Sequence, residues 1–125
     1  MLLKEIIEAR DALRKLENQA CSPKLSYTIM KILKETEDNE KFYIEKYRAI
    51  MDECAVKEDD GTFKVVDNMF TIKEDHKEQF EKMIKELTSL EVDDVSRKIK
   101  LSDLNDSIKI CPSDMNRLDI FIAEE

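Results

Sequence analysis

The first twenty residues carry an apolar stripe at helical spacing. Its members recur at steps of three, seven and three residues: Leu3, Ile6, Leu13 and Leu16. That spacing places them on one face of an α-helix, so we predict a helix over residues 2–20. A Ser22–Pro23 pair follows, and the residue before a proline avoids helical geometry. We therefore expect a tight corner, with Ser22 capping a second helix that starts at Pro23.

The second predicted helix is the longest and runs to about Asp52. Residues along it approximate a heptad seam with steps of three and four: Leu25, Ile29, Ile32, Thr36, Asn39, Tyr43, Lys46, Ile50 and Met51. Thr36, Asn39 and Lys46 interrupt the seam with polar side chains. In a coiled-coil pair such interruptions cost stability and set the register or the number of partners. The simplest arrangement is an antiparallel helical hairpin, in which the first two helices bury their stripes together.

A short β-segment is predicted after the second helix. The Asp-Gly dipeptide at residues 60–61 holds the chain's only glycine, and this dipeptide is the strongest short hairpin signal. β-forming residues follow at 62–65, and Asp67–Asn68 indicates another turn before residues 69–72. The pattern leaves open a small β-hairpin or a three-stranded ribbon, paired within one chain or between chains.

The remaining sequence predicts a third helix and a short terminal one. Residues 71–74 match the capping-box pattern, so the third helix is expected from there to about Leu90. Beyond it we predict extended segments at 91–95 and 98–101, a turn at 102–106, a strand at 108–111 ended by Pro112, and a short helix capped by Ser113. The predicted fold class is mainly α (α+β), in a single domain spanning residues 1–125.

Composition narrows the classes of partner. Charged residues make up 40% of the chain, far above the usual quarter, and the formal net charge is −8. Such a balance repels nucleic-acid phosphates, so direct nucleic-acid binding is disfavoured. Lysines interleaved with the acids also argue against mimicry of DNA. The chain has neither the apolar run of a signal peptide nor a membrane-spanning stretch, and we expect a cytoplasmic protein that does not enter a membrane.

No residue pattern indicates catalysis. Cys21, Cys54 and Cys111 are an odd, widely spaced set without a CxxC pair, which predicts small buried hydrophobes in a reducing compartment. His76 is the only histidine, and it lies among charged neighbours in a way typical of a solvated residue. The acidic pairs lack the spacing of a calcium loop. We expect no catalytic residues, no metal and no cofactor, since an enzyme would require a constellation assembled only by folding.

Two groups of residues are candidates for binding a ligand or partner. Tyr43, Tyr47 and Arg48 belong to the densest aromatic-plus-arginine patch, and binding hot spots favour those residue types. Aromatic residues at helical spacing are more often part of a core. Asn116 and Arg117 form a second planar donor group near the start of the last helix, although Arg117 also fits a surface residue that balances nearby acids.

The order of segments resembles small proteins encoded by tailed phages and prophages of Gram-positive bacteria. The segments that carry the resemblance are LLKEIIEARDALRKL, SPKLSYTIMKILKETE, VKEDDGTFKV, FEKMIKELTSLEVD and ICPSDMNRLDIFIAEE. The resemblance implies a phage origin, and thus the host-cell cytoplasm, but it supplies no active-site residues. Small acidic phage proteins of this kind are often virion-assembly factors or inhibitors of host defence, and both classes act by binding.

Two hypotheses follow. The first is a non-enzymatic, homo-oligomeric counter-defence factor that binds a host protein or sequesters a nucleotide immune signal. For a nucleotide, Arg48 or Arg117 would face phosphate, while Tyr43 or Tyr47 would stack on a base. The second is an assembly or scaffold-type protein of the phage tail or head, which predicts a complex with a virion protein and no small-molecule ligand.

Overall fold

Five α-helices and one two-stranded antiparallel hairpin make up the computed structural model, which describes residues 1–104 and 108–123. The helices and strands are α1 Leu3–Glu17, α2 Pro23–Glu35, α3 Glu37–Cys54, β1 Val65–Val66, β2 Met69–Phe70, α4 Lys77–Thr88 and α5 Pro112–Leu118. Single 3-10 turns lie at Glu74–His76, Leu101–Asp103 and Asp119–Phe121. The mainly helical fold is therefore confirmed. None of the described helices is long and apolar enough to cross a membrane.

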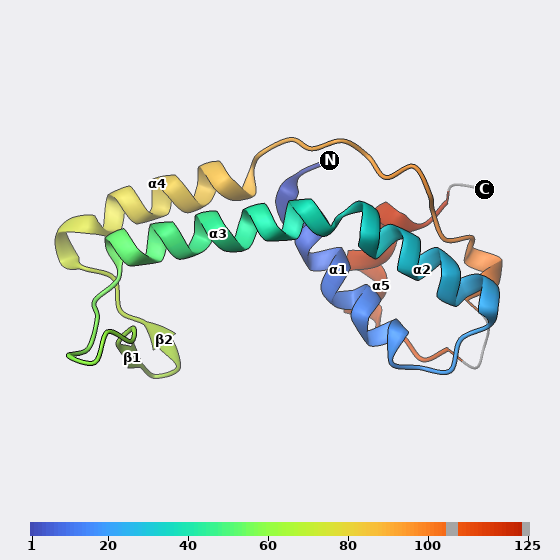
Figure 1. Ribbon diagram of the computed structural model, residues 1–125, viewed down its shortest axis with the longest axis horizontal. Coiled ribbons are helices and arrows are strands. Elements are labelled where there is room, and N and C mark those ends of the chain that lie inside the picture. Colours follow the sequence, from blue (N-terminus) through green and yellow to red (C-terminus); the bar gives the residue numbers. More distant parts are fainter. Residues whose placement is uncertain (105–107, 124–125) are drawn as a thin grey trace.

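The molecule has a body at one end and an arm at the other (Figure 1). The body consists of α1, α2, α5 and the segments that cover them. The arm comprises residues 37–90: α3 leads away from the body, α4 runs back beside it, and the β1–β2 hairpin hangs from the far end. The chain then returns to the body as an extended strap over residues 91–100.

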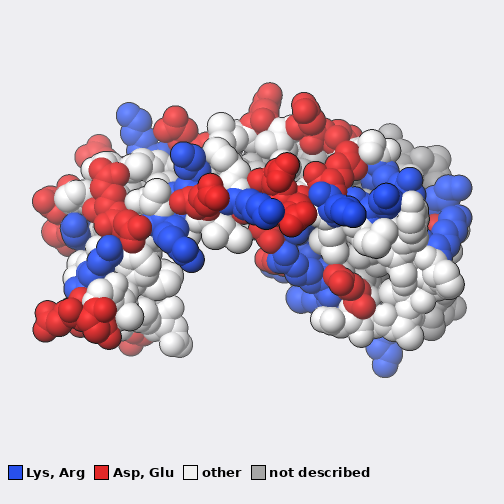
Figure 2. Space-filling view, viewed as in Figure 1, with Lys and Arg blue, Asp and Glu red and all other residues white. Residues whose placement is uncertain are grey.

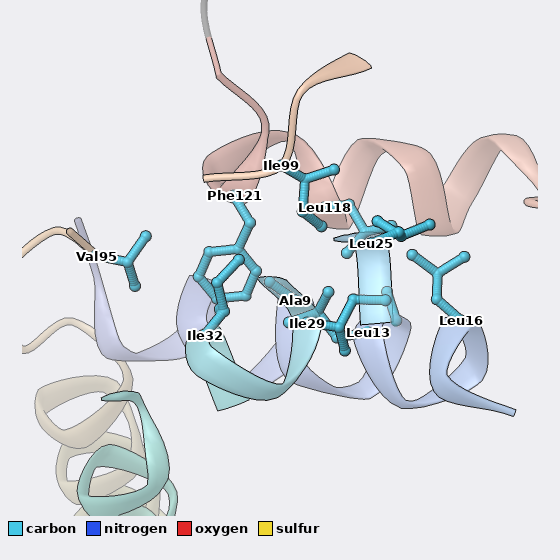
Figure 3. Close-up of a cluster of buried hydrophobic side chains, with 11 residues drawn as sticks. Ala9, Leu13, Leu16, Leu25, Ile29, Ile32, Val95, Ile99, Leu118 and Phe121 are labelled. Atoms are coloured by element: carbon cyan, nitrogen blue, oxygen red, sulfur yellow. The ribbon is translucent and has the colours of Figure 1, made fainter. Parts of the chain in front are cut away.

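The body is built around α1, whose apolar stripe is buried as the sequence predicts. Its core joins residues from α1, α2, the strap and the last two turns of the chain: Ala9, Leu13, Leu16, Leu25, Ile29, Ile32, Val95, Ile99, Leu118 and Phe121 (Figure 3). Burying one large aliphatic or aromatic side chain stabilises a fold by roughly 1.5–3 kcal/mol. This cluster is therefore the main source of stability, and it positions everything attached to the body.

The corner between α1 and α2 forms as predicted. The hydroxyl of Ser22 accepts a hydrogen bond from the backbone N–H of Leu25 at 3.2 Å, and Pro23 occupies the first helical position. Both residues satisfy requirements of a helix start, because the first N–H groups of a helix have no partner within it.

The prediction of one long second helix is wrong, because the helix is broken at Thr36 into α2 and α3. Thr36 leaves helical geometry (φ −98°, ψ 6°) and donates its hydroxyl to the carbonyl of Ile32 at 2.8 Å. The buried guanidinium of Arg10 donates both to the Thr36 hydroxyl, at 2.5 Å, and to the carbonyl of Leu33, at 2.6 Å. The polar interruption in the seam is thus a joint pinned by a residue of α1.

The seam consequently meets two different sets of neighbours. Up to Ile32 its apolar residues belong to the body core, whereas Ile50 belongs to a second cluster between α3 and α4. Lys46, which lies between Ile32 and Ile50 in the sequence, is exposed. The arm is an antiparallel helix pair held by this second cluster, whose buried members are Leu3, Ile50, Cys54 and Leu87.

Residues 55–72 form a β ribbon within one chain. Asp67 and Asn68 both have positive φ, 54° and 64°, which is the backbone of the tight turn that joins β1 to β2. Gly61, with φ 87°, lies in the turn predicted at residues 60–61, and a bridge pairs Lys57 with Phe63 beside it. Another bridge, between Ala55 and Ile72, ties the base of the ribbon to the end of α3. The ribbon therefore combines a two-stranded hairpin with a third, bridged segment.

Two predicted helix starts are corrected. Thr71 does not cap α4: its N–H bonds to the carbonyl of Lys64 in the ribbon, and α4 begins at Lys77 after a 3-10 turn. Ser113 lies inside α5, because Cys111 is the N-cap and Pro112 takes the first helical position.

The segments between α4 and α5 are mostly irregular. The strap is extended as predicted, and single bridges pair Glu91 with Leu2 and Ile99 with Ile122. The described residues of the predicted strand at 108–111 form no strand. The predicted turn at 102–106 begins as a 3-10 turn at Leu101–Asp103, and its residues 105 and 106 lie outside the described residues.

Candidate interaction surfaces

Tyr43 and Tyr47 lie together on the arm. Their rings stack on each other with centroids 5.9 Å apart and planes 21° from parallel, and both pack against the second cluster. Burial raises the pKa of Tyr43, and the neighbouring Tyr47 raises it further. Half-buried rings that already stack on each other serve largely as packing groups. Arg48, from the same helix, is exposed.

Asn116 and Arg117 lie on α5, which belongs to the body. Arg117 donates to Asp114 at 3.3 Å, and Lys15 of α1 donates to the same carboxylate at 3.1 Å. The Cys111 thiol bonded to Asp114, and then Lys15, hold the pKa of that carboxyl below its usual range. Arg117 thus balances a nearby acid. The described structure places α5 on the body and the tyrosines on the arm, so it does not bring the two predicted groups together (Figure 1).

The three cysteines occupy different environments. Cys54 is buried, and burial raises the pKa of its thiol. Cys21 is half-buried and Cys111 is exposed, so the prediction of three buried cysteines is correct only for Cys54. His76 contacts Asp75, with Nδ1 and Oδ1 2.8 Å apart. Across residues 1–104 and 108–123, no three His, Cys, Asp or Glu side chains are grouped to hold a metal ion.

Sequence reasoning missed the exposed apolar surface of the β ribbon. Both residues of each strand are exposed: Val65, Val66, Met69 and Phe70, with Met69 retaining 71% of its accessible surface. Successive side chains of a strand point to opposite faces, so the hairpin is apolar on both faces. A hairpin with one solvated face normally alternates apolar and polar residues. The two apolar pairs that flank Asp67–Asn68 without a polar residue were the signal.

The turn beside these strands is acidic. Glu58, Asp59 and Asp60 are exposed, and none of them forms an ion pair with another described residue. Asp60 accepts hydrogen bonds from the hydroxyl and backbone N–H of Thr62, at 2.6 and 3.0 Å, which lowers the pKa of its carboxyl. Figure 2 shows acidic side chains gathered at the tip of the arm, next to an uncharged surface.

A cleft of about 670 Å³ lies between α1 and the α2–α3 joint. We call its apolar lining residues the floor: Cys21, Ile29, Met30 and Leu33. We call its charged lining residues the rim: Arg10, Arg14, Glu17, Lys34, Glu37, Glu40 and Lys41. Arg14 bonds to Glu40 at 2.6 Å, and that bond, together with Arg10, lowers the pKa of Glu40. The cleft thus combines apolar and charged lining residues.

A smaller apolar groove of about 380 Å³ runs between α3 and α4. Phe42, Ala49 and Leu90 line it and are exposed, so the arm adds apolar surface along its length as well as at its tip.

Comparisons of the chain with protein-family models, curated proteins and solved structures find no match.

Proposed function

We propose that this chain is a non-enzymatic binding protein that works as a homo-oligomer and makes its contacts through the arm. The observation that carries this proposal is the β ribbon, whose two strands expose four apolar side chains to solvent. Contiguous exposed apolar surface on a soluble protein marks a site of interaction. Met and aromatic residues are also enriched in the buried centres of protein interfaces.

The size of the ribbon supports an interface role. A hairpin with two residues in each strand is at best marginally stable in water. Covering its apolar side chains in a complex would stabilise it by about 25 cal/mol per Å² of apolar surface removed from water. The ribbon is therefore expected to be more stable when a partner covers it than when it is exposed to water.

The proposed biological role follows from the resemblance to phage proteins. We infer a counter-defence factor that acts in the host cytoplasm by binding a host protein. A nucleotide signal is the less favoured ligand, because Tyr43 and Tyr47 stack on each other and Arg117 is engaged with Asp114. The alternative role, assembly of the phage tail or head, would use the same arm and a virion protein as partner.

Native mass spectrometry of the wild type and of Met69→Lys tests the proposal. We expect a defined oligomer for the wild type and a monomer for Met69→Lys, with unchanged helix content by circular dichroism. Leu101→Lys is the matched control, because Leu101 is exposed and apolar but belongs to the 3-10 turn whose Asp103 pairs with Lys24 of α2, on the body rather than on the arm. It should keep the oligomer.

The same preparations from infected cells identify the partner. A host protein lost from Met69→Lys would establish the counter-defence role, and a virion protein would establish the assembly role. A monomeric wild type, a wild type that binds neither protein, or a Met69→Lys variant that keeps the wild-type assembly would overturn the proposal.

A further inference from the structure

The geometry points to a specific self-contact: the β ribbon of one copy docks into the α1–α2 cleft of a second copy. This inference rests on the proposed homo-oligomer and assigns the two surfaces that form it. The chain carries both halves of such a contact. The ribbon offers exposed apolar strands beside an acidic turn, and the cleft is lined by apolar residues together with Lys and Arg.

The charges of the two regions are opposite in sign. The residues that line the cleft include four Lys and Arg against three Glu: Arg10, Arg14, Lys34 and Lys41 against Glu17, Glu37 and Glu40. Residues 55–72, the ribbon, contain two lysines against four carboxylates. Complementary charge of this kind guides association and sets the register of an interface. Each copy carries a net charge of −8, so an acidic turn that met no cations on the second copy would be repelled by it.

The rim has cations that a second copy can use. Lys34 forms no ion pair with any described residue. Lys41 is bound only to Glu37, four residues away on the same helix, at 3.4 Å, and an exposed pair of that type contributes about 0.3–0.5 kcal/mol. Glu40 is already paired with both Arg10 and Arg14, so it does not compete for Lys34. An incoming acidic turn therefore meets available positive charge.

The apolar parts also match. Met30 lies in the cleft floor with 47% of its surface exposed, so a ligand in the cleft would cover it. The cleft volume of about 670 Å³ falls within the range of roughly 300–1,000 Å³ that is typical of small-molecule pockets, so it has room for a large side chain. Met69 and its cross-strand partner Val66 share one face of the ribbon and are both exposed, so this face carries the side chains that would enter the cleft.

A chain cannot satisfy this contact by itself. The ribbon hangs from the far end of the arm, and α1 and α2 lie at the opposite end of the molecule (Figure 1). The contact is therefore between unlike surfaces of two copies. Two copies that exchange arms about a twofold axis form a closed dimer with two identical ribbon–cleft contacts, which is the arrangement that we assign.

A mixing experiment with two variants tests this assignment. Met69→Lys disables the ribbon but leaves the cleft intact, and Met30→Lys disables the cleft but leaves the ribbon intact. Each variant alone should be monomeric, with a dimer Kd raised more than about 30-fold, the loss typical of an interface hot spot. When the two are mixed, the ribbon of Met30→Lys can enter the cleft of Met69→Lys. Native mass spectrometry with one variant isotopically labelled should then show a heterodimer.

The outcomes separate this inference from the proposed function. If Met30→Lys remains an oligomer, or if both variants are monomeric and their mixture stays monomeric, the cleft is not the docking site. The ribbon would then pair with another surface, and the homo-oligomeric function would stand. If the wild type is monomeric, or if Met69→Lys keeps the wild-type assembly, the proposed function fails along with the inference. Leu101→Lys is again the control, and circular dichroism confirms that each variant is folded.

Discussion

Replacing Arg10 with Met tests whether one buried guanidinium holds the joint between α2 and α3. Arg10 retains only 4% of its accessible surface. It donates to the carbonyl of Leu33 at 2.6 Å, to the hydroxyl of Thr36 at 2.5 Å, and to the carboxylate of Glu40 at 3.1 Å. Met has an unbranched stem of similar width but cannot donate. The substitution therefore removes the three hydrogen bonds while keeping much of the packing.

The expected loss follows from the groups left behind. Breaking a buried ion pair from one side costs about 3–5 kcal/mol, because the remaining charge stays buried. Glu40 is 19% exposed and keeps Arg14 as a partner, which reduces that cost. The carbonyl of Leu33 and the hydroxyl of Thr36 lose a charged donor. We expect the free energy of unfolding to fall by about 3 kcal/mol. In a domain of this size the melting temperature should fall by roughly 10 °C.

Urea unfolding followed by far-UV circular dichroism measures this loss. Arg14→Met is the matched control, because it removes the other arginine from Glu40 at a position whose side chain is 48% exposed. An exposed ion pair contributes at most about 1 kcal/mol, so the control should be nearly neutral. Equal losses for the two variants, or a loss below about 1 kcal/mol for Arg10→Met, would refute the view that Arg10 pins the joint.

Three further predictions concern single groups. The pKa of Glu40 is lowered in the folded state, so its contribution to stability should be present above the unfolded value of about 4.3 and be lost as the pH falls through the folded value. Glu40→Gln should therefore remove part of the acid destabilisation in thermal melts from neutral pH to below that value. Asn68 has positive φ, so Asn68→Ile should lower the free energy of unfolding by about 1–2 kcal/mol in urea titrations, whereas Asn68→Gly should leave it unchanged or raise it. In the folded protein a thiol reagent should label the exposed Cys111 quickly and the buried Cys54 only after unfolding; rapid labelling of both in native buffer would contradict the burial of Cys54.

Local patterns settled much of the fold from the sequence. The apolar stripe of α1, the Ser22–Pro23 corner and the turn at Asp67–Asn68 each depend on residues within a few positions of one another. Their physical causes are also local. A serine side chain can cap a helix, the residue before a proline avoids helical geometry, and Asp and Asn tolerate positive φ. Such features are therefore readable without knowledge of the rest of the chain.

Tertiary contacts decided the features that the sequence pattern missed. Thr36 fits the interior of a long helix by spacing, but the buried Arg10, 26 residues earlier, donates a hydrogen bond to its hydroxyl at the point where α2 ends. Thr71 matches a helix cap by sequence, but its N–H pairs with Lys64 in the ribbon. In both cases a partner from another segment offers a hydrogen bond that local propensity cannot include.

The candidate surfaces show the same division. Composition and spacing identified Tyr43, Tyr47, Arg48, Asn116 and Arg117 as chemically suited to binding. Only the fold determined that the two tyrosines stack within a cluster and that α5 lies on the body. Likewise, the exposure of the β1 and β2 side chains follows from the fold, in which no other described segment covers them. Residue type states what a side chain can do, but exposure depends on which other segments cover it. That depends on the packing of the whole chain.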